Sequence, residues 1–160
     1  MTIAWPSVSM DPQRFEWWLE TATQEHRSPL TGAVQTQELR GARWGCRVEY
    51  YHLQEADSRL MWAFIGQMRG RSGRVAVPNF GRPRPLGAGG GTPVVDGAGQ
   101  TGSTLAVTGG PLSTSAWLVP GDFIGVGGRM HMVTASTNTD GSGDASVAIA
   151  PPLPAAPPSP

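Results

Sequence analysis

The sequence predicts a mainly β protein of the α+β type: an N-terminal β-sandwich with one packed helix, followed by a small β-barrel or sandwich domain. Alternating apolar and polar residues indicate strands in the first half, and one stretch has helical periodicity. The second half consists of short β-branched segments separated by glycines. The chain has 160 residues, enough for one or two small domains.

Two strands in the first half are predicted by residues that alternate between an inner and an outer face. Residues 15–22 follow this period, except that Trp18 adds an aromatic ring to the outer face. Residues 43–52 alternate most clearly, with Tyr51 on the outer face. Their predicted inner face comprises Trp44, Cys46, Val48, Tyr50 and His52.

A turn, a polar strand, a helix and a short strand complete the first half. Proline and glycine predict the turn at residues 28–32, and the polar strand follows at 33–40. After Gln54 the period becomes helical and ends at Gly70. The predicted apolar stripe of this helix comprises Ala56, Leu60, Ala63, Phe64 and Met68. Residues 75–77 predict an edge strand, because the proline that follows cannot donate to a ladder.

The composition changes near Leu86. Eleven arginines and eight acidic residues precede it, and one arginine and four aspartates follow, so net charges of +3 and −3 cancel. We therefore predict an N-terminal domain at residues 1–86 and a small β domain at 93–150. The glycine-rich residues 87–92 predict a linker. Residues 151–160 include six prolines and predict an extended tail.

The second half is predicted to hold five short strands. They are expected at residues 103–108, 116–119, 122–126, 129–135 and 144–150. Two adjacent glycines at 127–128 are typical of a hairpin turn. Five short strands suit a small barrel or sandwich.

Several classes of protein are excluded by residues that the sequence lacks. Cys46 is the single cysteine, so neither an internal disulfide nor a multi-thiolate metal site is expected. No lysine is present for a P-loop or a Schiff base. The apolar run at residues 61–65 is far shorter than the ~18 residues that a membrane span needs. We also expect no secretory signal, because the first ten residues lack a basic start and an apolar stretch.

Two motifs suggest ligand binding, but their context favours loops. Gly97–Gly102 matches G-x-G-x-x-G, yet a β-branched segment follows where a dinucleotide fold needs a helix. Asn138, Asp140, Ser142 and Asp144 have the spacing of a calcium loop, but Ile149 stands where the closing carboxylate is required. We therefore expect no cofactor and no metal.

Residues suited to catalysis or to nucleic-acid binding are present but poorly placed. Cys46 and His52 are about 20 Å apart along the predicted strand at ~3.3 Å per residue, too far for a hydrogen bond. His131 lies among apolar strand residues, which favours a packed histidine over a base. Arginines cluster within residues 69–84, but the balanced charge favours solvated loops over a phosphate-binding surface. We predict no catalytic residue.

Apolar residues beyond the predicted core suggest a subunit interface. Trp18 and Tyr51 fall on outer strand faces, and Met61, Trp62 and Ile65 flank the helical stripe. Small domains seldom leave so much aromatic surface exposed. Packing between the two domains would also cover these residues, and burial against neighbouring subunits is the functional interpretation.

The order of these features resembles tail proteins of long-tailed, siphovirus-type bacteriophages. The N-terminal resemblance lies in the aromatic strand, Ser28–Gln35, the Trp44 strand, the helix ending in Arg69-Gly70 and the strand at 75–80. The resemblance of the second half to the β domain that follows in such proteins lies in Asp96–Gln100, Pro120–Ile124, Val133-Thr134 and Ala150–Leu153.

The most similar proteins in kind are distal tail or minor tail proteins. The resemblance implies a non-enzymatic virion protein that assembles in the host cytoplasm into a ring, commonly a hexamer. Its expected partners are other copies of itself, the tail tube protein, the tail hub or tip proteins and the tape-measure protein. DNA would pass through the channel, and no membrane is involved.

Two alternatives remain open. One is a carbohydrate- or cell-wall-binding β module of a phage tail that uses Trp117 or Trp62 as a stacking platform. The other is a hydrolase that depends on His131, for which the sequence offers no convergent polar partners.

Overall fold

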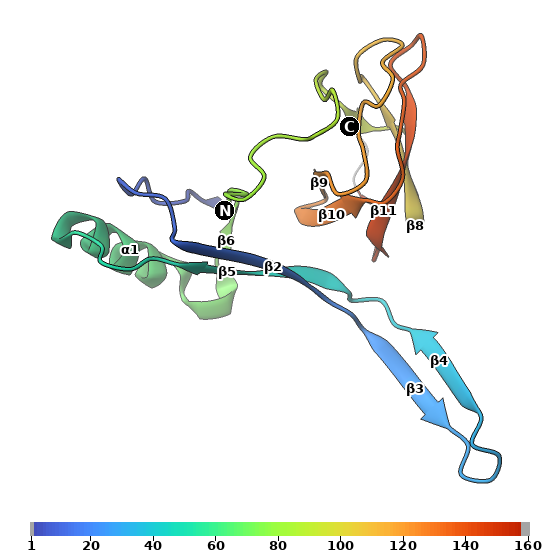
Figure 1. The fold of residues 1–160 in the computed structure, drawn as a ribbon, viewed down its shortest axis with the longest axis horizontal. Coiled ribbons are helices and arrows are strands. Elements are labelled where there is room, and N and C mark those ends of the chain that lie inside the picture. Colours follow the sequence, from blue (N-terminus) through green and yellow to red (C-terminus); the bar gives the residue numbers. More distant parts are fainter. Residues whose placement is uncertain (1, 158–160) are drawn as a thin grey trace. The chain divides into compact units, whose positions relative to one another are not determined.

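The protein is mainly β with one α-helix in the part of the chain that the computed structural model describes, residues 2–157 (Figure 1). This agrees with the predicted fold class. The chain forms two compact units: Met1–Trp17 with Cys46–Arg84, and Trp18–Gly45 with Pro85–Pro160. Within the described residues, no helix is long and apolar enough to cross a membrane.

The first unit contains a parallel strand pair, part of a two-stranded ribbon and the helix. Its elements are β1 (Thr2–Ile3), β6 (Arg74–Val75), α1 (Glu55–Met68) and a 3-10 turn at Gly70–Ser72. In the pair of β1 with β6, Thr2 lies beside Arg74 and Ile3 beside Val75. The ribbon pairs β2 (Arg14–Glu20) with β5 (Arg43–Glu49). Strand β5 ends before His52, so the predicted place of His52 on the inner face is wrong. This residue is exposed and has a φ of 58°.

Helix α1 presents a different face to its unit from the one predicted. The inward-facing residues are Asp57, which is buried, and the half-buried Met61, Phe64 and Met68. Of the predicted stripe, Ala56, Leu60 and Ala63 are exposed. Asp57 accounts for the rotation, because its carboxylate accepts a hydrogen bond from the backbone N–H of Ser9 at 3.2 Å and another from the Ser9 hydroxyl. Burial of this paired carboxylate brings positions 61, 64 and 68 inward, at helical spacing.

Aromatic rings hold the first unit together. Trp5 packs against Phe64 and Phe80, with ring centroids 5.5 and 5.9 Å apart. Phe15 meets Phe80 and Trp17 edge to face, at 5.3 and 5.1 Å. All five rings are only half-buried. Such edge-to-face pairs add about 0.5–1.5 kcal/mol each to what their burial contributes.

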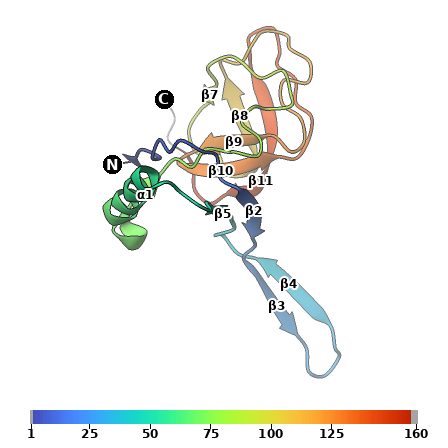
Figure 2. The ribbon, with the colours of Figure 1, turned by 60° about the vertical axis from the view of Figure 1, so that its left-hand side comes forward.

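The second unit is built on a five-stranded antiparallel sheet that curls on itself (Figure 2). Its order is β7-β8-β11-β10-β9. The strands are β7 (Val94–Val95), β8 (Gly102–Thr108), β9 (Phe123–Val126), β10 (Arg129–Val133) and β11 (Ala145–Leu153).

Two of the strand predictions for this half need correction. Residues 116–119 form no strand and contribute only an isolated bridge between Leu118 and Thr137. Strand β11 continues past residue 150 to Leu153, which pairs with Gly102 after a shift in register. The nitrogen of Pro151 has no hydrogen to donate to the ladder, and its carbonyl oxygen accepts a hydrogen bond from the His131 ring.

A β-hairpin, β3 (Thr23–Arg27) with β4 (Val34–Glu38), also belongs to the second unit. The predicted turn at residues 28–32 is confirmed, since the N–H of Gly32 donates to the carbonyl of Ser28 at 3.0 Å. The polar strand predicted at 33–40 is β4. Its partner β3 was not predicted, because its sequence of Thr, Gln, Glu, His and Arg has no apolar alternation.

The nine buried hydrophobic side chains that form the core of residues 2–157 all lie in the second unit. They form one cluster: Leu105, Val107, Trp117, Leu118, Val126, Val133, Val147, Ile149 and Leu153. Every one of these residues comes from the sheet or from the segment around Trp117. The first unit has no comparable core among its described residues.

The glycine-rich segment after Pro85 is bound to the sheet unit. Backbone N–H groups of Ala88, Gly89 and Thr92 donate to the carbonyls of Ala116, Trp117 and Gly109, at 2.9–3.0 Å. The buried carboxylate of Asp122 accepts the N–H groups of Leu86 at 2.7 Å, Gly87 at 3.2 Å and Val119 at 3.0 Å. A Cβ at Gly87 would lie 2.5 Å from the Trp117 carbonyl oxygen, so only glycine allows this approach.

Replacement of Asp122 by alanine should therefore destabilise the second unit by about 2–4 kcal/mol, because three backbone donors lose a charged acceptor. Urea unfolding of the full chain would measure the change in free energy. Asp96→Ala, which removes an exposed carboxylate of the same unit, is the matched control and should change it by less than about 0.5 kcal/mol. Equal effects of the two substitutions would contradict the assigned role of Asp122.

Candidate interaction surfaces

The residues considered for catalysis are not brought together within either unit. Cys46 belongs to the first unit, where burial raises the pKa of its thiol, so it is a poor nucleophile. His26 lies on the exposed hairpin and His131 inside the second unit. Among residues 2–157, no group of three or more His, Cys, Asp or Glu side chains is placed to hold a metal ion.

In the two motifs that suggested ligand binding, the polar side chains make hydrogen bonds to nearby backbone groups of the same chain. In the glycine motif, the Gln100 side chain accepts the Ala106 N–H at 2.6 Å and donates to the Ala106 carbonyl at 3.0 Å. In the other loop, one carboxylate oxygen of Asp140 accepts the N–H groups of Ser142 and Asp144 at 2.8 and 2.9 Å. Asn138 accepts the N–H of Ala116 at 2.8 Å. These oxygens shape turns within the chain.

His131 is packed in the second unit with 1% of its surface exposed. Its Nδ1 lies 2.7 Å from the Pro151 carbonyl oxygen, so the neutral ring donates there, and Nε2 is buried without a hydrogen-bond partner. Burial lowers the pKa of the ring, and the charge of Arg129 lowers it further, whereas the bond to Pro151 opposes the shift. A proton on Nε2 would have no acceptor, so the geometry favours a structural histidine.

The candidate interface residues differ in exposure. Trp62 is 71% exposed, and Ile65, Tyr51 and Trp18 are exposed as well, whereas Met61 is half-buried on the inner face of α1. Trp62 and Ile65 are one turn apart on the helix, whereas the exposed Leu60 points to another side of it. We call Trp62 and Ile65 the outer helix patch. It is an apolar surface on a unit that has no buried apolar core of its own.

Trp18 lies over a glycine on the paired strand. A Cβ at Gly45 would come within 2.6–2.9 Å of the Trp18 indole ring, so the ring covers the backbone where a side chain would otherwise stand. The indole N–H donates to Glu20 at 3.4 Å, and Glu20 pairs with Arg43 Nε at 2.7 Å. This contact explains the glycine in the middle of β5 and the tryptophan on the outer face of β2.

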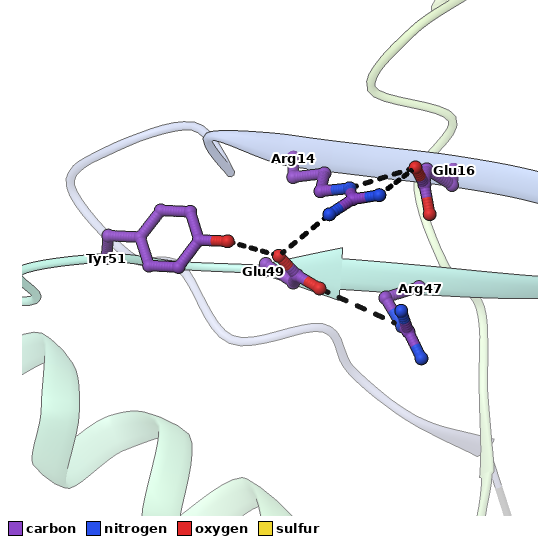
Figure 3. A network of polar contacts seen from close by, with 5 residues as sticks. All are labelled: Arg14, Glu16, Arg47, Glu49 and Tyr51. Atoms are coloured by element: carbon purple, nitrogen blue, oxygen red, sulfur yellow. Dashed lines mark hydrogen bonds and ion pairs between the residues drawn. The ribbon is translucent and has the colours of Figure 1, made fainter.

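Charged residues beside Tyr51 form a polar network in the first unit (Figure 3). Arg14 donates two hydrogen bonds to Glu16, at 2.9 and 2.6 Å. Glu49 accepts a hydrogen bond from the Tyr51 hydroxyl and lies 4.0 Å from Arg14 and 3.8 Å from Arg47. The bond to Glu49 raises the pKa of Tyr51, and desolvation adds to the effect. Tyr51 is thereby held with its ring on the surface.

The hairpin of β3 and β4 is exposed along its whole length, and sequence reasoning missed it as a candidate surface. All ten residues of the two strands are exposed. At its tip, Leu30 is 94% exposed, between Pro29 and a turn that Gly32 closes with a φ of 69°. An isolated two-stranded hairpin is marginally stable in water. The arrangement therefore offers two free strand edges and an apolar tip.

The second unit also encloses an apolar cavity of about 340 Å³. It lies at the open side of the curled sheet, where β7 and β9 are the two edge strands. Val94 and Gly125 lie at its exposed rim, and Leu105, Val107 and Val147 are among its buried walls. Trp117 lines it too, but is only 3% exposed and donates its indole N–H to the Gly90 carbonyl at 3.2 Å. The prediction of a stacking platform at Trp117 is therefore wrong.

No family model matches this chain, and no curated protein matches it.

The lowered pKa of His131 predicts a loss of stability in acid. Because the unfolded histidine titrates near 6.5 and the folded one below it, the unfolded state binds more protons as the pH falls below about 6.5. The free energy of unfolding should fall there by at most about 1.4 kcal/mol per pH unit from this group. Urea unfolding from pH 7.5 to 5 would measure it, with His131→Asn, which can still donate to Pro151, as the comparison. An equally steep decline in the variant would contradict the assignment.

The bond between Tyr51 and Glu49 predicts a change in phenol titration. Glu49→Gln should lower the pKa of Tyr51 toward its ordinary value of about 10, because the carboxylate that stabilises the protonated phenol is gone. Ultraviolet absorbance titration would measure it, and Tyr51→Phe identifies the contribution of Tyr50. A profile identical to that of the wild-type protein would contradict the network in Figure 3.

Proposed function

We propose that this chain is a structural subunit of a bacteriophage tail, which assembles with copies of itself into a ring that connects the tail tube to the distal tip. One observation carries the proposal: among the described residues, the first unit has no fully buried apolar side chain, yet it exposes the outer helix patch. A unit of this kind needs a neighbour to complete its core.

The energetic argument compares what is buried with what is needed. A domain of about 60 residues is marginal even when it buries about 60% of its unfolded surface. Half-buried rings such as Trp5 and Phe80 give only part of the stabilisation that fully buried ones would give. Exposed Trp62 and Ile65 are the anchors that interfaces use most effectively, an aromatic ring beside an aliphatic side chain. An adjacent subunit would supply the missing burial.

The hairpin supports the same proposal. Its strands are exposed on both faces and have unpaired edges, which in a monomer can pair with the strands of other molecules. Glu25, Arg27 and Glu38 keep these edges charged, which discourages indiscriminate pairing. A head-to-tail contact between unlike surfaces closes into a ring when its rotation allows closure. This is the type of assembly that the resemblance to tail proteins implies.

The remaining parts of the proposal come from that resemblance. They are a hexameric copy number, a place in the virion, contacts with the tube, hub or tip and tape-measure proteins, and passage of DNA through the channel. The β-sandwich expected in residues 1–86 and the barrel or sandwich expected in 93–150 also stay predictions. We propose no catalytic activity.

A sugar-binding module is the second candidate, and Trp62 is the observation that favours it. Its exposed ring could stack on a sugar face. However, a specific sugar site also needs convergent polar side chains. Of the exposed residues one turn from Trp62 on α1, Ile65 is apolar, Gly66 has no side chain and Arg59 is ion-paired with Glu55. Retention of the protein on host cell-wall polysaccharide, abolished by Trp62→Ala, would favour this candidate.

The ring proposal is tested by the mass of the purified protein in solution. We expect a discrete oligomer by light scattering and rings by negative-stain imaging. Trp62→Glu should weaken each contact by about 2–4 kcal/mol, the loss typical of an interface anchor, or about 30- to 700-fold in the association constant. The variant should therefore dissociate at micromolar concentration.

Leu112→Glu is the matched control, because Leu112 is similarly exposed but lies in a loop of the second unit. It should leave the mass unchanged. A wild-type protein that is monomeric at every concentration, with and without the tail proteins encoded beside it, would overturn the proposal. So would a Trp62→Glu variant that assembles as tightly as the control.

A further inference from the structure

We propose that residues 154–157 form a strap over the buried side chain of His131, and that this strap opens in weak acid so that water reaches the ring. The strap consists of two alanines between two prolines. The proposal goes beyond the ring and does not depend on it, because the strap and His131 belong to the second unit of one chain.

The strap and His131 line the same small cavity. Its volume is about 120 Å³, and its other walls come from Leu153, Arg129 and the end of β9. The strap packs on the turn that follows β9: Pro157 is buried, and a Cβ built on Gly127 would lie 3.9 Å from the Pro157 Cβ. A water molecule occupies about 30 Å³ in the liquid, so a small movement of the strap is enough to hydrate the ring.

His131 has a polar atom that no group of the described chain satisfies. The ring donates from Nδ1 to the Pro151 carbonyl at 2.7 Å, which leaves Nε2 as a hydrogen-bond acceptor. Nε2 is buried without a partner, on a side chain that is only 1% exposed. A proton added there would create a buried charge with no acceptor, which is strongly unfavourable. The protonated ring therefore favours a state in which water reaches Nε2.

The surroundings of His131 offer no negative charge that could hold the added proton. Burial lowers the pKa of the ring, the bond to Pro151 opposes this shift, and the positive charge of Arg129 lowers the pKa further. Neither β9, β11 nor the strap contains an Asp, Glu or second His residue. With the strap closed, none of these elements compensates the charge, so acid acts against the closed state.

The strap is the neighbour of His131 that moves most easily. Ladder pairs join β10 to β9 on one side and to β11 on the other. Among residues 2–157, in contrast, no backbone hydrogen bond joins the strap to the rest of the chain. Its two prolines have no N–H group to donate. The bond from Nδ1 to Pro151 can persist, since both nitrogens of a protonated imidazole are donors. Opening therefore separates Pro157 from the turn and leaves the sheet intact.

The direction and size of the pH response follow from the two states of the ring. Above about pH 6.5 the ring is neutral whether the strap is open or closed, and the closed state is favoured. Below this pH the hydrated ring of the open state binds a proton before the buried ring does. The ratio of open to closed strap should then rise by up to about tenfold per pH unit, or about 30-fold between pH 7.5 and 5.

Thiol labelling measures this ratio in the full chain. Pro157→Cys is combined with Cys46→Ala, so that a single thiol is present and is protected while the strap is closed. The labelling rate with 4,4′-dithiodipyridine is divided by the rate for the same protein unfolded in urea at the same pH. This quotient, the open fraction, should rise by up to about 30-fold from pH 7.5 to pH 5.

Two histidine variants of this labelling protein identify the titrating group. His131→Asn should abolish the rise, because asparagine takes up no proton in this range. His26→Asn is the matched control, since it makes the same change at an exposed histidine of the same unit, and it should keep the full rise.

A disulfide that holds the strap closed gives a second measurement. The 3.9 Å between Cβ positions at 127 and 157 lies within the range of about 3.5–4.5 Å that disulfides require. Gly127→Cys and Pro157→Cys are combined with Cys46→Ala, and the reduced form of the same protein is the control. Titration of the His131 ring by NMR should give a lower midpoint in the oxidised form, because the open state is then inaccessible.

An open fraction that rises in acid, is lost in His131→Asn and is kept in His26→Asn would support the proposal. An open fraction that stays constant, or that rises equally in His131→Asn, would overturn it. So would an open fraction equal to the globally unfolded fraction from urea unfolding at the same pH, because the whole unit would then open. If His131→Asn does not fold, equal NMR midpoints of the oxidised and reduced forms would overturn it instead. The ring is tested separately, by mass.

Discussion

The uneven burial of apolar side chains is the constraint on which the rest of this structure depends. The second unit concentrates its buried apolar residues in the sheet and in the segment around Trp117, whereas the first relies on half-buried aromatic rings such as Trp5, Phe15 and Phe80. A chain organised in this way buries only part of its apolar surface by its own folding. Its exposed tryptophan, its bare hairpin and its unfilled cavity all leave apolar or strand surface uncovered. These features favour a protein whose stability is inseparable from its concentration and its neighbours.

Buried polar contacts fix how segments of this molecule pack, and exposed ones orient side chains on its surface. Asp57 turns the helix by bonding Ser9, and Asp122 binds the chain after Pro85 to the sheet. Both carboxylates are buried and bonded to backbone N–H groups. By contrast, the ion pairs around Glu49 are exposed, where such pairs contribute about 0–1 kcal/mol. Their role is to hold Tyr51 in place on the surface.

How much could be predicted from the sequence depended on periodicity. The mainly β class, the helix and most strands followed from alternation, since each apolar residue needs a buried face. Strand β3 was not predicted, because none of its residues is buried and its sequence therefore has no apolar alternation. The buried face of the helix was predicted incorrectly, because Asp57 is paired with Ser9 and occupies an inward position. Trp18 was recognised as anomalous, but its contact with Gly45 is a cross-strand event that a single sequence does not reveal. The cavity was not predicted either, because residues far apart in the sequence line it.

The glycines after Pro85 have a consequence for proteolysis. Composition would make residues 85–92 the obvious place for a protease to separate the halves of the chain. Five N–H groups of this segment instead donate to Asp122 and to the carbonyls of Ala116, Trp117 and Gly109, so the segment cannot extend into a protease cleft without breaking these bonds. The turn that carries Leu30 is exposed, and its hydrogen bonds are all local, within residues 28–33. Limited digestion of the free chain would thus begin at the hairpin tip and leave the segment after Pro85 attached to the sheet.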